Sequence, residues 1–203
     1  MNVGLASSEI TFRVLAMALL VVMNLIRRRT GRRADNREAR SALRENTLDT
    51  LLLFPVTFLL QLSIVAYAVF PDLIAWAQIS LPVWSRWIGV ALGIGALSLL
   101  AWADRELGKN FSMTLRIRED HTLITTGPYH WIRHPIYSVG LLFGFAVFLV
   151  SANGFVGVCW IGGCSLLYAH RIPKEEALML EEFADEYRAY MQRTGRLLPR
   201  CFK

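Results

Sequence analysis

Long apolar runs separated by polar segments dominate the hydrophobic pattern of this chain. Four runs stand out, at about Phe12–Ile26, Leu51–Phe70, Trp87–Ala103 and Ile136–Tyr168. Runs of this length predict membrane-crossing helices, because a hydrocarbon core of about 30 Å needs roughly 20 apolar helical residues. The first run is somewhat short, and Arg13 near its start is expected to reach the membrane interface. Its basic cluster follows it and no cleavage pattern is present, so we expect a transmembrane helix rather than a signal peptide.

The last run is too long for one span. At 1.5 Å per residue, its roughly 33 residues would extend about 50 Å as a single helix. Ser151–Gly154 (Ser-Ala-Asn-Gly) lies at its middle and is a turn signal. The pattern therefore predicts two antiparallel helices here, and an all-α polytopic membrane protein of about five spans.

Basic residues concentrate between the first two runs. Residues 27–48 hold eight arginines and three acidic residues, which accounts for five of the net charge of +6. By the positive-inside rule this loop is cytoplasmic, and alternation then places residues 105–134 and the C-terminus on the same side. As a topology signal, this arginine-rich loop requires no ligand other than membrane lipids. Because no stacking aromatic residues accompany the arginines, a nucleic-acid partner is not expected.

The chain divides into two regions. Residues 1–104 hold three spans and the arginine-rich loop, and residues 105–203 hold the candidate chemistry, the terminal hairpin and a polar tail. In the tail, apolar residues recur every three to four positions between charged ones, which predicts an amphipathic helix along the membrane surface or over the site. The three cysteines show no paired spacing, so neither a disulfide scaffold nor a metal site is predicted.

Polar residues flank the terminal hairpin on both sides. Thr126–Tyr137 (Thr-Gly-Pro-Tyr-His-Trp-Ile-Arg-His-Pro-Ile-Tyr) precedes it, and Arg171, Glu175 and Glu176 follow it. Ionisable residues crowded at one membrane edge usually mark a site. Two plainer interpretations stay open: Arg133 with its neighbouring histidine is an interface anchor, and Arg171 with Glu175 is a helix pair. Alternatively, the guanidinium of Arg171 binds an acidic head group.

Two further patterns favour structural roles. His130 and His134 are four residues apart, but Pro135 disfavours helical geometry at the second histidine, so no metal is expected there. The pairs Gly89/Gly93 and Gly140/Gly144 have the spacing that lets membrane helices approach closely, and helix packing is their favoured interpretation.

Over about residues 105–198 the chain resembles the isoprenylcysteine carboxyl methyltransferase family and its bacterial relatives. The matching segments, in order, are Leu107–Phe111, His121–Tyr129, Arg133–Tyr137, Arg171–Glu176 and Phe183–Tyr187. The ordered combination is specific, although no single segment is. The first hundred residues match only as hydrophobic spans.

The resemblance implies S-adenosyl-L-methionine as cofactor, bound at the cytosolic membrane face without a Rossmann fold. The implied cofactor-binding residues are His121, Thr122, Leu123, Ile124, Tyr129, His134, Pro135, Ile136, Tyr137 and Glu175. Arg171 would face the methyl acceptor, so that Arg171 and Glu175 carry the catalytic assignment.

The implied activity is methylation of a lipophilic or membrane-delivered acceptor, foremost the carboxylate of a prenylated cysteine. A carboxylate is ionised at pH 7, so the reaction needs no general base. The alternatives are a thiol S-methyltransferase, an NADPH-dependent membrane reductase of the sterol-reductase type, which shares an Arg-His-Pro-Tyr element, and a membrane scaffold without activity.

Overall fold

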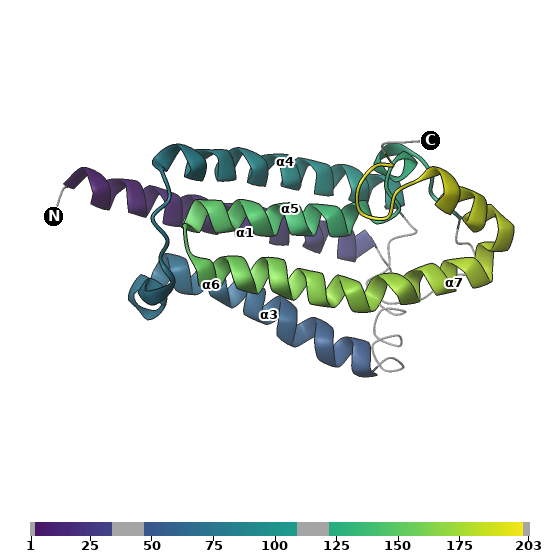
Figure 1. The fold of residues 1–203 in the computed structure, drawn as a ribbon, viewed down its shortest axis with the longest axis horizontal. Coiled ribbons are helices and arrows are strands. Elements are labelled where there is room, and N and C mark those ends of the chain that lie inside the picture. Colours follow the sequence, from purple (N-terminus) through teal and green to yellow (C-terminus); the bar gives the residue numbers. More distant parts are fainter. Residues whose placement is uncertain (1–2, 34–46, 109–121, 201–203) are drawn as a thin grey trace.

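The computed structural model describes residues 3–33, 47–108 and 122–200 of the 203-residue chain. Its long helices lie side by side along the long axis of the molecule (Figure 1). In chain order the elements are α1 (Val3–Arg33), α3 (Thr47–Val69), η1 (Pro71–Ala77), α4 (Val83–Leu107), η3 (Gly127–His130), α5 (Pro135–Ser151), α6 (Gly154–Gly157), the π-helical turn η4 (Val158–Gly162) and α7 (Gly163–Arg193).

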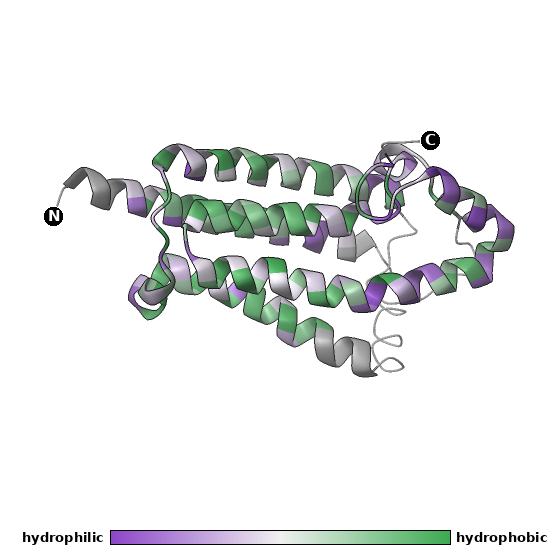
Figure 2. Cartoon of the chain, in the orientation of Figure 1, coloured by the Kyte–Doolittle hydropathy of each residue, from purple (hydrophilic) through white to green (hydrophobic). Residues whose placement is uncertain are grey.

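Several of these helices have the length and apolarity of membrane spans. Three qualify alone, at Ser8–Thr30, Val83–Leu107 and Gly154–Arg193. α3 qualifies together with η1, across a bend of 106°, while the apolar helix α5 is shorter at 17 residues. Figure 2 shows hydrophobic residues along the middle of the bundle and hydrophilic residues gathered toward the end that holds the C-terminus. The all-helical, multi-pass membrane architecture is confirmed, while the number of five spans stays a prediction.

The predicted turn inside the last apolar run is present. Ala152 adopts a left-handed conformation (φ 47°) and ends α5. The side chain of Asn153 accepts hydrogen bonds from the backbone N–H groups of Phe155 and Val156, which caps the next helix. The Asn153 amide also donates to the carbonyl of Ile74 at 2.9 Å, which ties the turn to η1. The run therefore folds into a helical hairpin, as its length required.

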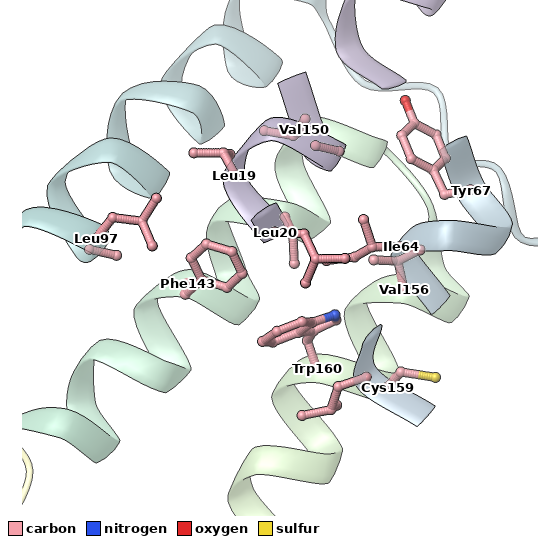
Figure 3. Close-up of a cluster of buried hydrophobic side chains, with 14 of the residues drawn as sticks. Leu19, Leu20, Ile64, Tyr67, Leu97, Phe143, Val150, Val156, Cys159 and Trp160 are labelled. Atoms are coloured by element: carbon pink, nitrogen blue, oxygen red, sulfur yellow. The ribbon is translucent and has the colours of Figure 1, made fainter. Parts of the chain in front are cut away.

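Small residues let the helices approach closely, as their spacing predicted. A Cβ added to Gly89 of α4 would lie 2.7 Å from the Cβ of Leu149 on α5. Gly140 of α5 leaves room in the same way for the hydroxyl of Tyr168 on α7. Between these contacts lies the apolar core shown in Figure 3, where the rings of Phe143 and Trp160 lie 5.0 Å apart. Close packing of this kind supplies the dispersion contacts that hold membrane helices together.

A buried arginine connects four helices at the end of the bundle where the α5–α6 turn lies. Arg86 of α4 donates to the Val150 carbonyl at 2.9 Å and to the Tyr67 hydroxyl at 2.8 Å, and it pairs with Glu9 of α1. Its guanidinium also lies 4.0 Å from the ring centre of Phe12. Because an isolated charge inside a membrane protein is costly, these partners make Arg86 a structural connector.

The tail is helical, but it continues the last hairpin helix instead of forming a separate element. α7 runs through Pro173 without ending and turns back at Ala184, whose backbone angles (φ 41°, ψ −112°) break the helix. Beyond this kink, Tyr187 and Tyr190 are buried. Figure 1 shows the yellow end of the chain folding back toward η3. This fold-back places tail residues beside the motif that precedes α5.

Candidate functional site

The residues of the candidate site gather at the end of the bundle where the chain's C-terminus lies (Figure 1). His134 precedes Pro135, the first residue of α5, and has non-helical angles (φ −122°, ψ 60°), as the proline predicted. His130 and His134 therefore do not share a helical face. His130 is exposed and lies edge-on to Trp131. Within the described residues, no group of three or more His, Cys, Asp or Glu is arranged to hold a metal ion.

Backbone hydrogen bonds attach the motif to the C-terminal segment. The N–H of Arg133 donates to the carbonyl of Gly195 at 2.8 Å, and that of His134 donates to the carbonyl of Arg196 at 3.1 Å. The Arg133 guanidinium adds bonds to the carbonyls of Met191 at 3.1 Å and Thr194 at 2.6 Å. These contacts fix the loop before α5 against the segment that follows α7.

Glu175 lies at the centre of one polar cluster. It accepts a hydrogen bond from the Tyr137 hydroxyl. One of its oxygens lies 3.4 Å from Nδ1 of His134, and the other lies 3.4 Å from Nη2 of Arg171. The Arg171–Glu175 ion pair along the helix, which the sequence allowed as one interpretation, is therefore present. The cluster brings together four residues that the sequence singled out.

Glu176 lies beside it and has different partners. Its carboxylate lies 3.0 Å from Nε of Arg133 and also pairs with Arg196. Its side chain is only 5% exposed, whereas that of Glu175 is 26% exposed. Two guanidinium groups thus satisfy Glu176, which makes it the structural carboxylate, and Glu175 is the more accessible of the two.

His134 lies between these carboxylates. Its Nε2 is 3.4 Å from Glu176, while Nδ1 faces Glu175. Burial disfavours the charged imidazolium, but the carboxylates of Glu175 and Glu176, which accept from the ring and carry negative charge, outweigh this effect and raise the pKa of His134 above its ordinary value. The site therefore favours a positive charge on this histidine.

Three rings stack next to the carboxylates. His134 and Tyr137 are stacked with centroids 5.6 Å apart, and Tyr137 and Tyr168 are stacked at 4.4 Å. Tyr168 comes from α7, one turn before Arg171, and was not predicted as a site residue. It closes an apolar run, so only its position just before the polar segment marked it.

Tyr129 is a buried residue among those predicted for the site. It is 7% exposed, and its carbonyl accepts a hydrogen bond from the Tyr190 hydroxyl at 2.6 Å. Burial, and next the negative charge of Asp104, raise the pKa of the Tyr129 hydroxyl well above its ordinary value. That hydroxyl is therefore a neutral donor.

The remaining predicted residues surround this cluster in the chain. Thr122 is exposed, and Leu123 and Ile124 are half-buried in an irregular segment before η3. His121 lies outside the described residues. Pro135 is buried, and Ile136 packs against the apolar core. Their assignment to the cofactor stays a prediction. Two residues that sequence reasoning gave no site role contact site residues here. Tyr168 stacks on Tyr137, and Arg196 pairs with Glu176.

Comparison with known proteins finds a family model that matches the part of the chain carrying this arrangement. Residues 88–181, a range that contains the stacked rings and both carboxylates, match the model of the isoprenylcysteine carboxyl methyltransferase (ICMT) family. This part of the chain is similar to the ICMT family. The resemblance seen in the ordered sequence segments is thereby confirmed.

Curated proteins from animals, plants and yeast are similar to this chain. Protein-S-isoprenylcysteine O-methyltransferase of Homo sapiens is 26% identical over 128 residues, covering 62% of this chain and 45% of that protein. Protein-S-isoprenylcysteine O-methyltransferase B of Arabidopsis thaliana is 36% identical over 99 residues, covering 45% and 48%. A probable enzyme of the same name from Oryza sativa subsp. indica is 25% identical over 158 residues, covering 77% and 83%. The chain thus spans about half the length of the human and Arabidopsis relatives.

The fold has a solved counterpart. The eukaryotic intramembrane Ras methyltransferase ICMT superposes with a TM-score of 0.54 at 23% identity, covering 77% of this chain and 53% of that one. At this identity the superposition supports a shared fold. That fold is the one of an intramembrane protein, which agrees with the apolar helices described above.

Proposed function

We propose that this chain is an integral membrane methyltransferase that uses S-adenosylmethionine and methylates the carboxylate of a lipophilic acceptor, such as a prenylated cysteine. The observation that carries the proposal is the cluster of His134, Tyr137, Arg171 and Glu175 inside the ICMT-family region. The relatives, named as isoprenylcysteine O-methyltransferases, support the acceptor class.

The described residues fit this cofactor. The tyrosine rings of Tyr137 and Tyr168 offer aromatic surface that attracts a sulfonium cation. The partly exposed carboxylate of Glu175 suits an ammonium group, and the buried hydroxyl of Tyr129 has no hydrogen-bond partner within the described residues. S-adenosylmethionine supplies an electrophilic methyl group when it is bound. The predicted positions 121–124 and 134–137 would complete its contacts.

Arg171 and Glu175 have complementary roles in the proposal. The side chain of Arg171 is 11% exposed, so its charge acts in a poorly hydrated environment, where attraction to an acceptor carboxylate is strong. Its planar guanidinium matches a carboxylate and orients it without removing a proton. Glu175 contacts both Arg171 and Tyr137 and so orients the arginine relative to the stacked rings. Catalysis then rests on alignment and on the exclusion of water.

The rival activities have less support. None of the relatives reported above is a reductase, and no contact described here favours NADPH. A thiol acceptor would need a thiolate, which is scarce at pH 7, so its rate would rise toward about pH 8.5. A carboxylate acceptor is already ionised well below neutral pH, so its rate would not follow such a profile.

Calorimetric titration in detergent tests the cofactor. The purified protein should bind S-adenosylhomocysteine and not NADPH. Glu175→Gln removes the accessible carboxylate and should weaken binding by about 1–3 kcal/mol. Arg188→Gln is the matched control, because Arg188 lies on the same helix and, among the residues that the structure describes, forms an ion pair with the exposed Asp185. Binding of NADPH in place of S-adenosylhomocysteine, or unchanged affinity in a folded Glu175→Gln sample, would contradict the proposal.

A further inference from the structure

A second buried carboxylate lies close to the site but comes from the N-terminal half of the bundle. Asp104, near the end of α4, is only 6% exposed. The Thr30 hydroxyl of α1 donates to its Oδ2 at 2.7 Å, and Nη1 of Arg27, also on α1, lies 3.8 Å from its Oδ1. The carboxylate is therefore oriented from one side by α1.

The end of α4 packs against η3, the short helix that carries Tyr129. The Thr126 hydroxyl donates to Glu106 at 2.9 Å, and the rings of Trp102 and Trp131 lie 6.2 Å apart. Next to burial, the negative charge of Asp104 is the main cause that raises the pKa of the Tyr129 hydroxyl. The carboxylate of α4 and the hydroxyl of η3 thus belong to two elements that pack against each other, and both residues are buried.

Both groups retain an unused hydrogen-bonding position. Within the described residues, neither Oδ1 of Asp104 nor the hydroxyl of Tyr129 has a hydrogen-bond partner, although both atoms are buried. Buried polar atoms in native proteins are nearly always bonded to protein, water or ligand. The Tyr129 hydroxyl offers a donor and the carboxylate offers an acceptor. A group that accepts from one and donates to the other would satisfy both.

We propose that Asp104 and Tyr129 bind a ribose hydroxyl of the S-adenosylmethionine cofactor, a role for Asp104 that rests on the function proposed above. A hydroxyl is the one group of this cofactor that donates and accepts at a single atom. The ammonium group only donates, the carboxylate only accepts and would be repelled by Asp104, and the adenine amine only donates. An ordered water has the same capacity as a hydroxyl, and it is the alternative that the experiment separates.

The proposal gives α1 a part in the site. Arg27 and Thr30 hold the Asp104 carboxylate in place, so the first helix of the chain acts as a positioning element for a cofactor contact. Aspartate also binds ribose hydroxyls in other nucleotide-binding folds, which shows that the chemistry is suitable.

The test compares S-adenosylhomocysteine with its 2′-deoxy and 3′-deoxy analogues by calorimetry on the full chain. The wild type should bind one of the two analogues about 10- to 100-fold more weakly. Asp104→Asn and Tyr129→Phe should weaken binding of S-adenosylhomocysteine and leave the affinity for that analogue nearly unchanged. Glu106→Gln, on the same turn of α4 but bonded to Thr126, is the control and should keep the wild-type preference.

The possible outcomes distinguish a failure of this inference from a failure of the proposed function. If the wild type binds all three compounds equally, or if Asp104→Asn weakens all three equally, Asp104 serves the fold with an ordered water and this inference is wrong, while the proposed function stands. If Asp104→Asn does not fold because Arg27 loses its ion pair with the carboxylate, the comparison is made with Tyr129→Phe, which changes no charge. If the wild type does not bind S-adenosylhomocysteine at all, the proposed function fails and this inference fails with it.

Discussion

At the residue scale, two adjacent glutamates of α7 have different tasks. Glu176 is buried under Arg133 and Arg196 and holds the C-terminal segment to the loop before α5. Glu175 contacts His134 and Arg171 and remains partly exposed. Neighbouring positions on a helix point about 100° apart, which is why one carboxylate is enclosed while the other stays partly exposed.

The histidine between these carboxylates makes stability depend on pH. Because the folded-state pKa of His134 is raised above 6.5, its contribution is complete below about pH 6.5 and is lost as the pH rises through the raised value. Thermal unfolding of the wild type in detergent should show this loss as the pH rises above about 6.5. His134→Gln should have a flatter profile in the same range. An equally steep profile in that variant would assign the loss to other groups.

Arg171 is expected to act on the acceptor. Arg171→Lys keeps the charge but loses the planar donor pair, so turnover should fall, while the affinity for S-adenosylhomocysteine stays near the wild-type value. Steady-state rates and calorimetry on the same sample separate the two effects. Loss of cofactor binding with normal turnover per bound cofactor would show that the assigned role is wrong.

Sequence reasoning predicted the meeting of residues from the two motifs and missed the residues that join them only in the folded chain. His134, Tyr137, Arg171 and Glu175 flank one predicted hairpin, so their meeting was foreseeable. Arg196 reaches Glu176 only because the chain folds back after α7. Asp104 closes an apolar span on α4, and nothing in its neighbourhood in sequence announces Thr30 as its partner.

At the element scale, the kink in α7 decides where the tail goes. Hydrophobic periodicity predicted a helix there, and the structure has one, but no pattern marked the break at Ala184. Its positive φ of 41° is a conformation that a residue with a Cβ rarely adopts. The kink turns the tail back so that Tyr187 and Tyr190 become buried over the site end.

Replacement of Ala184 by glycine should therefore stabilise the protein. The change removes the Cβ that disfavours positive φ, and the gain should be about 1 kcal/mol. Ala189→Gly is the matched control, since Ala189 is also exposed but lies in regular helix, and it should cost about 0.5–1 kcal/mol. Thermal unfolding of the two variants provides the measurement. A loss of stability in both would mean that the chain does not need positive φ at residue 184.

At the scale of the whole molecule, the bundle has a polar end and an end with few charges. The site lies at the polar end, and the Arg86 connector and the Asn153 turn lie at the other. Apolar run lengths and arginine placement were enough to predict the helices and their alternation. They could not predict which helices touch, because close contacts such as Gly89 with Leu149 depend on packing across distant segments.

The arginine-rich segment predicts that the polar end faces the cytoplasm. A reporter fused after Lys203 should give a cytoplasmic signal, and one inserted at the exposed Ser80, beside the Asn153 turn, should give the opposite signal. The insertion is made at Ser80 and not in the nearby turn itself, because Asn153 is buried and its side chain donates to the carbonyl of Ile74. The same signal at both positions would contradict the predicted topology.

The central claim is that the cluster around Glu175 and Arg171 serves methylation of a lipophilic carboxylate, and transfer of a radiolabelled methyl group tests it most directly. The protein in detergent, given labelled S-adenosylmethionine and an amine-blocked farnesylcysteine, should yield a base-labile methyl ester. The same farnesylcysteine with its carboxylate already esterified should remain unlabelled. Labelling of the esterified compound, or no labelling of the free acid by protein that binds the cofactor, would contradict the account.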